Sequence, residues 1–335
     1  MRSIAVTETS QIAEARRGAT DIAATLGCDE LAAGKVAIVA SELATNLIKH
    51  GGGGELLLSS YEVGAEAGVQ LIALDRGRGI ANLQECLRDG YSSAGSAGHG
   101  LGAIKRQSAM MEVATWPSLG TAILARVEVR GDAARDERPK GVSPTSSGCV
   151  NVPKPGEEVC GDACTVADTP AGRTAIVVDG LGHGPDAAIA AAEALRLFHR
   201  HQHLPVPQIL EYLHAGLRPT RGAAVAIARY DAQRSTVIYG GIGNIAGSIQ
   251  TGQEMRRMIS MNGTAGHIAR RIQTFDYPSA GGLVIMHSDG LTLHWSLDRY
   301  PGITRMHPTL IAAVLYRDHA RRRDDATVLV VKVEK

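Results

Sequence analysis

Aromatic residues and net charge are both scarce in this chain of 335 residues. Only 4% of the residues are Phe, Trp or Tyr, whereas 44% are hydrophobic and 21% are charged. This composition is that of a soluble globular protein, and the length suffices for two ordinary domains. The 35 basic and 34 acidic residues leave a formal charge of +1, which provides no overall field toward a nucleic acid or an anionic membrane. We therefore expect neither as a partner.

Long hydrophobic runs are missing as well. The first residues, MRSIAVTETSQIAEARRGATD, lack the apolar core of a signal peptide, and no later run approaches a bilayer span. The five cysteines are an odd number spread through a large chain, which favours reduced thiols. These observations predict a cytoplasmic protein. Cys160 and Cys164 in CGDAC are either zinc ligands or small core thiols, and no second Cys or His pair follows nearby.

One segment of the chain has almost no large apolar residue. Residues 130–148, RGDAARDERPKGVSPTSSG, are charged and then rich in Pro and Ser. Such a segment cannot bury enough surface to fold. It predicts a linker over 131–148, between a domain of residues 1–130 and a domain of residues 149–335.

The periodicity of apolar residues predicts an α/β fold for each domain. For the first domain it predicts helices over 10–27, 31–51 and 100–114 and strands over 54–63, 67–75 and 120–129. For the second domain it predicts helices over 185–203, 206–217 and 307–317, and strands over 172–179, 222–231, 235–241, 244–250, 281–290 and 326–334. Several of these strands follow one another without a helix, so a layered sandwich suits the second domain better than a parallel doubly wound sheet.

A glycine-rich turn follows an aspartate at the end of an apolar strand in TAIVVDGLGHGPDAA. Gly180, Gly182 and Gly184 come directly after Asp179. Either the glycines cradle a dinucleotide pyrophosphate, as in a nicotinamide-dependent oxidoreductase, or they fold the backbone closely around a metal ion held by Asp179. The dinucleotide fingerprint ends its strand in glycine, and an acid there repels pyrophosphate. The metal interpretation is therefore favoured.

Further aspartates share this local form. Asp289 also lies between an apolar strand and a glycine, Asp162 lies in CGDAC, and Asp324 and Asp325 directly precede the last strand. A single Asp-Gly pair is typical of a turn, but several acids at the ends of apolar strands are costly unless a cation neutralises them. Carboxylates suit Mg or Mn better than zinc. The set predicts one shared cation site.

The motifs GDAC, VVDGLGHG, YGGIGN, HSDGL and DDATVLVV, in this order over residues 150–335, resemble the SpoIIE-like metal-dependent protein serine/threonine phosphatases, and in particular their RsbX-like members. The resemblance implies an α/β/β/α sandwich with two Mn or Mg ions. Two such ions lower the pKa of a bridging water, which then attacks phosphorus in line. The implied substrates are phosphoserine and phosphothreonine on STAS-domain antagonists of anti-sigma factors or on stressosome-type phosphoproteins.

The same resemblance assigns roles to the acids. It implies that Asp179 bridges the two ions, that the Gly180 carbonyl contacts one of them, and that Asp289 and Asp324 complete the other. Asp162 would hold a metal-bound water and act in catalysis. Asp325 would hold the metal ligands in position without contacting the ions. His183 is either an acid in the reaction or simply part of the loop.

Three polar residues share one face of a predicted helix in the first domain. Glu42, Asn46 and His50 in SELATNLIKH follow at steps of four. By itself this pattern is more typical of a solvated polar stripe on an ordinary amphipathic helix. However, ALDRGRGI then gives Asp75, Gly77 and Gly79, and SAGHGLGAIKR opens a helix with glycines, where backbone N–H groups receive phosphates; the residues concerned are Gly98, Gly100, Leu101 and Gly102.

These three stretches, over residues 1–130, resemble the GHKL ATPases, and among them the RsbT-like serine kinases that act in sigma-factor switches. The resemblance implies that Asn46 holds Mg on ATP, that Asp75 accepts from the adenine amine, and that the glycines, with His50 and Leu101, line the nucleotide. Glu42 would be the base that deprotonates a substrate serine. The alternative is a domain that binds ATP and sequesters or activates a partner without transferring phosphate.

Overall fold

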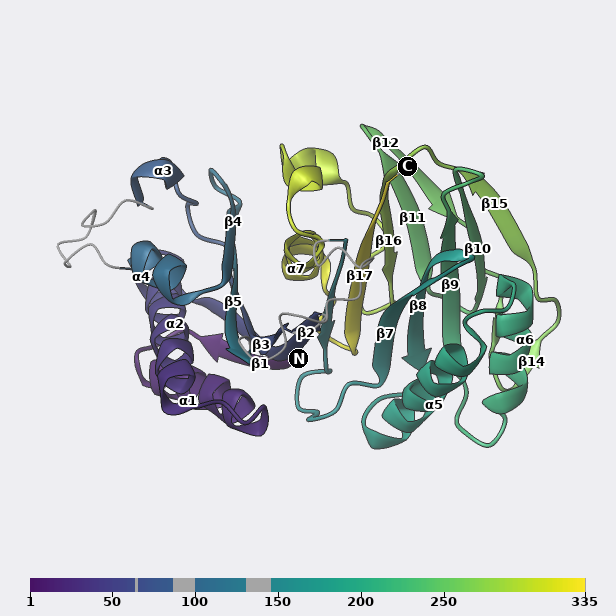
Figure 1. Ribbon diagram of the computed structural model, residues 1–335, viewed down its shortest axis with the longest axis horizontal. Helices are drawn as coiled ribbons and strands as arrows, with labels where there is room; N and C mark the ends of the chain where they lie inside the picture. Colours follow the sequence, from purple (N-terminus) through teal and green to yellow (C-terminus); the bar gives the residue numbers. More distant parts are fainter. Residues whose placement is uncertain (64–65, 87–99, 131–145, 335) are drawn as a thin grey trace. The chain divides into compact units, whose positions relative to one another are not determined.

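The computed structural model describes residues 1–63, 66–86, 100–130 and 146–334 (Figure 1). It divides into two compact units, Met1–Pro144 and Thr145–Lys335. Each unit has its own hydrophobic core. Gly98 and most of the predicted linker lie outside the described residues.

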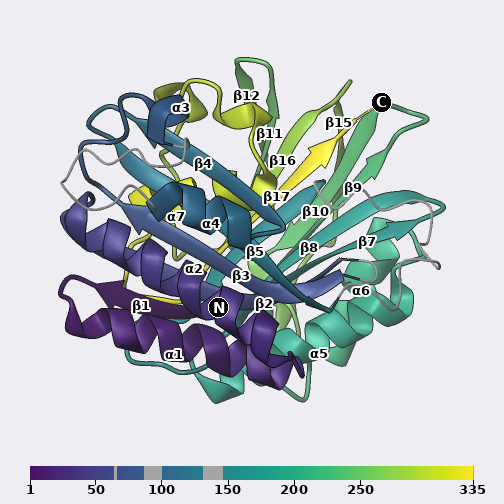
Figure 2. The ribbon, with the colours of Figure 1, turned by 60° about the vertical axis from the view of Figure 1, so that its left-hand side comes forward.

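The first unit is an α/β sandwich built on one antiparallel sheet. The strand order is β1-β2-β3-β5-β4, and Figure 2 shows α1, α2 and α4 lying across one side of this sheet. The strands are β1 (Arg2–Val6), β2 (Gly54–Val63), β3 (Glu66–Asp75), β4 (Met110–Trp116) and β5 (Gly120–Arg130), and the helices are α1 (Ser10–Thr25), α2 (Glu30–Lys49), α3 (Leu83–Cys86) and α4 (Gly100–Gln107).

Helix α2 is the central helix of this core. It begins after Asp29, whose carboxylate accepts from the Ala32 N–H at 2.7 Å, as N-cap residues do. Its 20 residues are long and apolar enough to span a membrane by length and composition, so the expectation that no run approaches a bilayer span is wrong. The apolar face of the helix packs into the core of the first unit, through Val36, Val39 and Leu43 among others, as in the core helix of a globular domain.

The strand β4 corrects the predicted helix over 100–114. The helix α4 ends at Gln107, and Met110–Trp116 pairs antiparallel with β5. Met111 and Val113 alternate along β4 and both pack against the helical core, which is the period of a strand. The pairing with β5 decides this segment, because local propensity is overridden by tertiary contacts. The strand β1 and the short helix α3 were not predicted either.

The second unit is an α/β/β/α sandwich, as the sequence predicts. Its two antiparallel sheets have the orders β15-β10-β9-β8-β7 and β12-β11-β16-β17-β6, and β13 pairs with β14 separately. Figure 1 shows α5 and α6 on the outer side of the first of these sheets and α7 beside the second. One core lies between the sheets and another under α5 and α6.

The elements of this unit are β6 (Ser147–Val152), β7 (Asp162–Thr169), β8 (Gly172–Gly180), α5 (Pro185–His201), α6 (Val206–Gly216), β9 (Ala223–Asp231), β10 (Thr236–Ile242), β11 (Ala246–Thr251), β12 (Glu254–Met258), β13 (Gly263–Thr264), β14 (Ile268–Ala269), β15 (Thr274–Pro278), β16 (Gly282–His287), α7 (Pro308–His319) and β17 (Ala326–Val333). Two 3-10 helices precede α7, over Leu297–Arg299 and Ile303–Arg305.

Two features at the start of this unit bear on the predictions. β6 begins at Ser147 and pairs with β17, so Ser147 and Gly148 belong to a strand rather than to the linker. Cys149 on β6 and Cys164 on β7 face each other between the two sheets, with their Cα atoms 7.5 Å apart. This separation exceeds that of an ordinary disulfide, so the reduced state of this pair stays a prediction. The Cys164 sulfur lies against Cys149 rather than Cys160, which disfavours a zinc site made by Cys160 and Cys164.

Candidate functional site

The ends of several strands place the acids of the second unit together. β7 begins with Asp162, β8 ends with Asp179 and Gly180, and the pairing of these two strands sets Asp162 directly opposite Asp179. Asp289 follows the end of β16, and Asp324 and Asp325 directly precede β17. The sheet register, rather than proximity in sequence, therefore builds this acid cluster.

The acids of the cluster raise one another's pKa values. Burial raises the pKa of Asp179 well above its ordinary value, and the charges of Asp162, Asp289, Asp324 and Asp325 raise it further. Burial likewise raises the pKa of Asp162, although hydrogen bonds from the Ser288 and Thr327 side chains oppose the shift. Close carboxylates that lack a neutralising partner behave in this way. The cluster is thus short of positive charge.

The donor set fits a divalent cation. Asp162 is only 5% exposed, and its buried Oδ2 has no hydrogen-bond partner among the described residues, which is costly for a carboxylate. Hard carboxylate oxygens are the ligands that Mg and Mn prefer. In the described part of the chain no group of three His, Cys, Asp or Glu side chains is arranged to hold an ion.

Asp289 is oriented by a residue that the sequence analysis did not identify. Asn244, in the loop between β10 and β11, donates from Nδ2 to Asp289 Oδ2 at 2.8 Å. Burial and the charge of Asp324 raise the pKa of Asp289, whereas Arg321 and the Asn244 hydrogen bond lower it. The motif YGGIGN contains Asn244, but nothing in the local pattern indicates that this amide reaches the end of β16.

Asp325 contacts backbone groups from a second loop. Its Oδ1 accepts from the Lys154 N–H at 2.8 Å and its Oδ2 from the Gly161 N–H at 3.0 Å. The side chain is 3% exposed. With both oxygens engaged, Asp325 fixes the loop that leads into Asp162, which suits a supporting role better than direct metal ligation.

The glycines after Asp179 allow a tight turn into α5. A Cβ on Gly180 would collide with the carbonyl oxygen of Ala187, and Gly182 and Gly184 have φ values of 95° and 72°, which side chains rarely adopt. β8 pairs with β7 and β9 in antiparallel fashion. The dinucleotide interpretation is therefore wrong, because that fingerprint needs a parallel βαβ unit.

His183 lies in the same turn. Its Nδ1 is 2.6 Å from Oε1 of Glu157, and 47% of the His183 side chain is exposed. The imidazole is thus paired with a carboxylate at the surface of the loop. The sequence offered no signal for Glu157 as its partner.

The first unit brings together a second set of predicted residues. Glu42 and Asn46 lie on α2, and a Cβ on Gly100 at the start of α4 would lie 3.3 Å from Asn46 Oδ1 and 3.8 Å from Glu42 Oε2. Asn46 Nδ2 is buried without a hydrogen-bond partner among the described residues. An unpaired polar atom beside a glycine suits a position where a ligand approaches the backbone.

The residues predicted for the adenine side of a nucleotide are also close together. Asp75 ends β3, and its Oδ1 accepts from the N–H groups of Gly77 at 2.8 Å and Thr121 at 3.1 Å. A Cβ on Gly77 would lie 2.9 Å from the carbonyl oxygen of His50, and burial, with the charges of Arg78 and Lys49, lowers the pKa of His50. Thr121 was not identified from the sequence.

The remaining predicted residues of this site serve the turn and the core. Gly79 has a φ of 76°, and a Cβ there would collide with the Trp116 carbonyl. Leu101 packs against the core of the first unit and Gly102 is buried in α4. These positions shape the region around Asp75 and Asn46 without offering a polar side chain.

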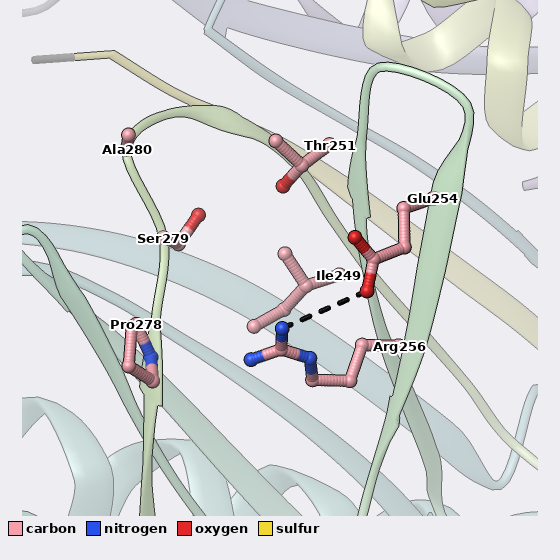
Figure 3. Close-up of a pocket in the computed structure, with 7 residues that line it drawn as sticks. All are labelled: Ile249, Thr251, Glu254, Arg256, Pro278, Ser279 and Ala280. Carbon is pink, nitrogen blue, oxygen red and sulfur yellow. Dashed lines mark ion pairs between the residues drawn. The ribbon is translucent and has the colours of Figure 1, made fainter.

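A separate cavity lies at one edge of the second unit (Figure 3). It is bounded by the β11–β12 hairpin and by residues 278–280, and Arg256 and Glu254, both on β12, form an ion pair at 3.7 Å on its hairpin side. None of the predicted site residues lines this cavity.

Comparisons with known proteins agree with this division into two units. Residues 5–126 match the family described as histidine kinase-like ATPase domain, and residues 170–334 match the family of stage II sporulation protein E (SpoIIE). The chain is 30% identical over 95 residues to the serine/threonine-protein kinase RsbT of Bacillus subtilis, a match that covers 28% of this chain and 71% of RsbT.

Two solved structures are similar to part of this chain. A structure described as "The bacterial stressosome: a modular system that has been adapted to control secondary messenger signaling" is 28% identical with a TM-score of 0.51, covering 55% of this chain and 97% of its own. RsbX in complex with magnesium is 21% identical with a TM-score of 0.47, covering 56% of this chain and 94% of its own.

The fold and these matches define the class: a histidine kinase-like ATPase unit followed by a SpoIIE-like unit. The chain belongs to the RsbT family through its first unit, and it fuses this RsbT-like domain to a SpoIIE-like phosphatase domain. The oxidoreductase interpretation is wrong.

Proposed function

We propose that the second unit is a Mn- or Mg-dependent phosphatase for phosphoserine and phosphothreonine on partner proteins. The observation that carries this proposal is the pair Asp162 and Asp179, set opposite each other at the ends of β7 and β8 with one buried carboxylate oxygen unpartnered among the described residues. Such a site is electrostatically incomplete without a cation.

In this proposal Asp179, the Gly180 carbonyl, Asp289 and Asp324 hold two ions, which when bound activate water and stabilise the charge on the phosphoryl oxygens. The chain's own groups prepare this site. Asn244 keeps Asp289 turned toward the cluster, and Asp325 fixes the loop before Asp162 through the N–H groups of Lys154 and Gly161.

Asp162 has a distinct role in the proposed reaction. Ser288 and Thr327 donate to its carboxylate, while the buried Oδ2 has no partner among the described residues. Because burial and the neighbouring acids raise its pKa, Asp162 is suited to orient a water and to hold a proton during turnover.

We further propose that the first unit binds ATP with Mg and acts as a serine kinase. Asn46 would hold the ion, Asp75 would accept from the adenine amine, and Glu42, one helical turn from Asn46, would deprotonate the substrate serine. The proximity of Gly100 to both Glu42 and Asn46 supports this proposal. The competing proposal is an ATP-dependent sequestering module without transfer, since binding residues alone do not require catalysis.

The partners that we propose are STAS-domain antagonists of anti-sigma factors or stressosome-type phosphoproteins, within a cytoplasmic partner-switching system. The proposal draws support from the similarity to RsbT and from the likeness to a structure described in the context of the bacterial stressosome. A kinase-like unit and a phosphatase unit in one chain provide the two opposing activities that such a switch uses.

Hydrolysis of an aryl phosphate tests the phosphatase proposal. We expect turnover by the full chain in Mn and none in EDTA, and we expect Asp179→Asn to lower kcat by about 100-fold or more, since the loss of a strong electrostatic contribution has at least this effect. Asp168→Asn is the matched control: Asp168 also lies on the β7–β8 hairpin, but it pairs with Arg173 at 2.7 Å. Turnover that persists in EDTA and in Asp179→Asn would overturn the proposal.

A further inference from the structure

An arginine with no role in the proposed function lies against the turn that follows Asp179. A Cβ on Gly182 would lie 3.2 Å from Nη1 of Arg221. Nη2 of Arg221 is 2.5 Å from Oδ2 of Asp186, in the first turn of α5. The guanidinium therefore sits between the glycine turn and the start of α5.

The backbone around Arg221 is fixed to this turn. The Leu181 N–H donates to the Gly222 carbonyl at 3.0 Å, and Nε2 of His267 donates to the Arg221 carbonyl at 2.9 Å. The Thr220 hydroxyl donates to the Leu217 carbonyl at 2.7 Å and accepts from the Gly222 N–H at 3.0 Å. The position of the Arg221 backbone is thus set by hydrogen bonds on both sides.

The side-chain pair, in contrast, is open to solvent. Arg221 and Asp186 are 52% and 59% exposed, and ion pairs at such exposure contribute little to stability. Arg221 can therefore exchange Asp186 for another anion at small cost. A phosphate monoester offers two negative charges and a geometry that guanidinium binds in bidentate fashion.

The negative charge of the acid cluster is the reason why a phosphorylated substrate needs a positively charged side chain nearby. Asp162, Asp179, Asp289 and Asp324 repel a phosphorylated substrate wherever bound cations leave them uncompensated. The backbone N–H of Arg321 donates to the carbonyl of Gly290, the residue after Asp289, at 2.8 Å, so Arg321 lies near the Asp289 end of the cluster. Arg221 supplies positive charge on the other side, next to the turn that begins at Asp179.

Resting on the proposed phosphatase function, we propose that Arg221 is a specificity-determining residue that binds the phosphoryl group of the substrate, with Asp186 as an internal competitor for its guanidinium. Arg221 lies against Gly182 rather than on an outlying loop. We therefore assign its contact to the phosphoryl group and not to acidic residues that flank the phosphoserine.

Two variants with opposite expected effects test this proposal. For an aryl phosphate in Mn, we expect Arg221→Ala to raise KM by about 10-fold, because hydrogen bonds to charged groups have effects of this size, with kcat within about 2-fold. We expect Asp186→Asn to lower KM by about 3-fold, because the interaction energy of an exposed ion pair corresponds to a factor of this size. The inhibition constant of inorganic phosphate should follow KM in both variants. Arg196→Ala, which removes a comparable exposed pair with Glu193 on α5, should change neither.

Several outcomes would overturn the proposal. An unchanged KM in Arg221→Ala, or a KM raised by Asp186→Asn, contradicts it. An Arg221→Ala effect on a phosphopeptide but not on the aryl phosphate assigns the arginine to flanking acidic residues instead. If the wild-type chain hydrolyses nothing, the proposed phosphatase function fails. Calorimetric titration with inorganic phosphate in Mn then tests the role of Arg221 separately. If the wild type binds inorganic phosphate and Arg221→Ala does not, the assignment of Arg221 is kept. If the wild type binds no phosphate, the assignment is overturned.

Discussion

The two units place buried polar groups under different electrostatic conditions. In the second unit, five aspartates meet at strand ends and burial raises the pKa values of Asp162, Asp179 and Asp289. In the first unit, the unpartnered group is the neutral amide of Asn46, and Asp75 accepts two backbone hydrogen bonds. A neutral amide costs less to bury than repelling carboxylates. The second site therefore depends more strongly on a bound cation.

Loss of an acid in the second unit should have the largest effect on activity. We expect Asp162→Asn to lower kcat for aryl phosphate hydrolysis by about 100-fold or more, because an amide cannot take up the proton in a general acid–base role. Steady-state kinetics in Mn would measure this. Kinetics within 2- to 3-fold of the wild type would show that Asp162 takes no part in the reaction.

The corresponding change in the first unit separates its two proposed roles. We expect Glu42→Gln to reduce phosphate transfer from labelled ATP to a STAS-domain partner by about 100-fold, as for loss of a general base, with ATP affinity unchanged. Glu30→Gln, in the first turn of the same helix, is the control. If the wild type binds ATP but transfers no label to any STAS-domain partner, the sequestering module is the better account.

Metal-free stability should depend on pH in the second unit. The pKa of Asp179 is raised by burial and by four neighbouring acids, so the folded state favours the protonated carboxyl. The protonated carboxyl of Asp179 therefore makes its full contribution to the free energy of unfolding below the unfolded pKa of about 4. This contribution decreases as pH rises above that value, by at most about 1.4 kcal/mol per pH unit. We expect the free energy of unfolding in EDTA to fall as pH rises, and Mn to offset the fall.

The two tryptophans allow this comparison to be measured unit by unit. Trp116 ends β4 in the first unit, and Trp295 belongs to the second. Urea titrations followed by fluorescence in Trp116→Phe and Trp295→Phe each report one unit. A fall in stability with pH that is equal in both units, or absent from the second, would contradict the contrast between the two sites.

The smallest expected effect concerns Asn244. We expect Asn244→Ala to weaken Mn affinity by about 10-fold, the lower end for groups that orient a metal ligand, because Asp289 loses the donor at 2.8 Å. Calorimetric titration would measure the affinity. Asn262→Ala, at an exposed loop position, is the control, and equal affinities in the two variants would remove Asn244 from the site.

The sequence predicted what depends on local pattern. Asp179 and Asp289 each lie between an apolar strand and a glycine, so their placement at strand ends followed from the periodicity. Asn244, Ser288 and Thr327 have no such local signal, because their contacts with the acids arise from the pairing and stacking of sheets. The approach of Cys149 to Cys164 likewise depends on two sheets facing each other.

The two errors in the first unit have different physical origins. The segment Met110–Trp116 follows α4 closely and was predicted as its continuation, but its pairing with β5 makes it a strand. Length and composition make α2 similar to a membrane span, and only its packing into the core of the first unit distinguishes it. A tertiary contact, rather than local propensity, decided the secondary structure of Met110–Trp116, whereas the expectation for α2 failed on composition.

Calorimetric titration of Mn into the metal-free chain tests the central claim most directly, because it needs neither a substrate nor a partner. For the wild type the account predicts binding of two ions per chain in the absence of nucleotide, and for Asp179→Asn the loss of at least one of them, with Asp168→Asn unchanged. No Mn binding by the wild type, or an identical titration for Asp179→Asn, would contradict it.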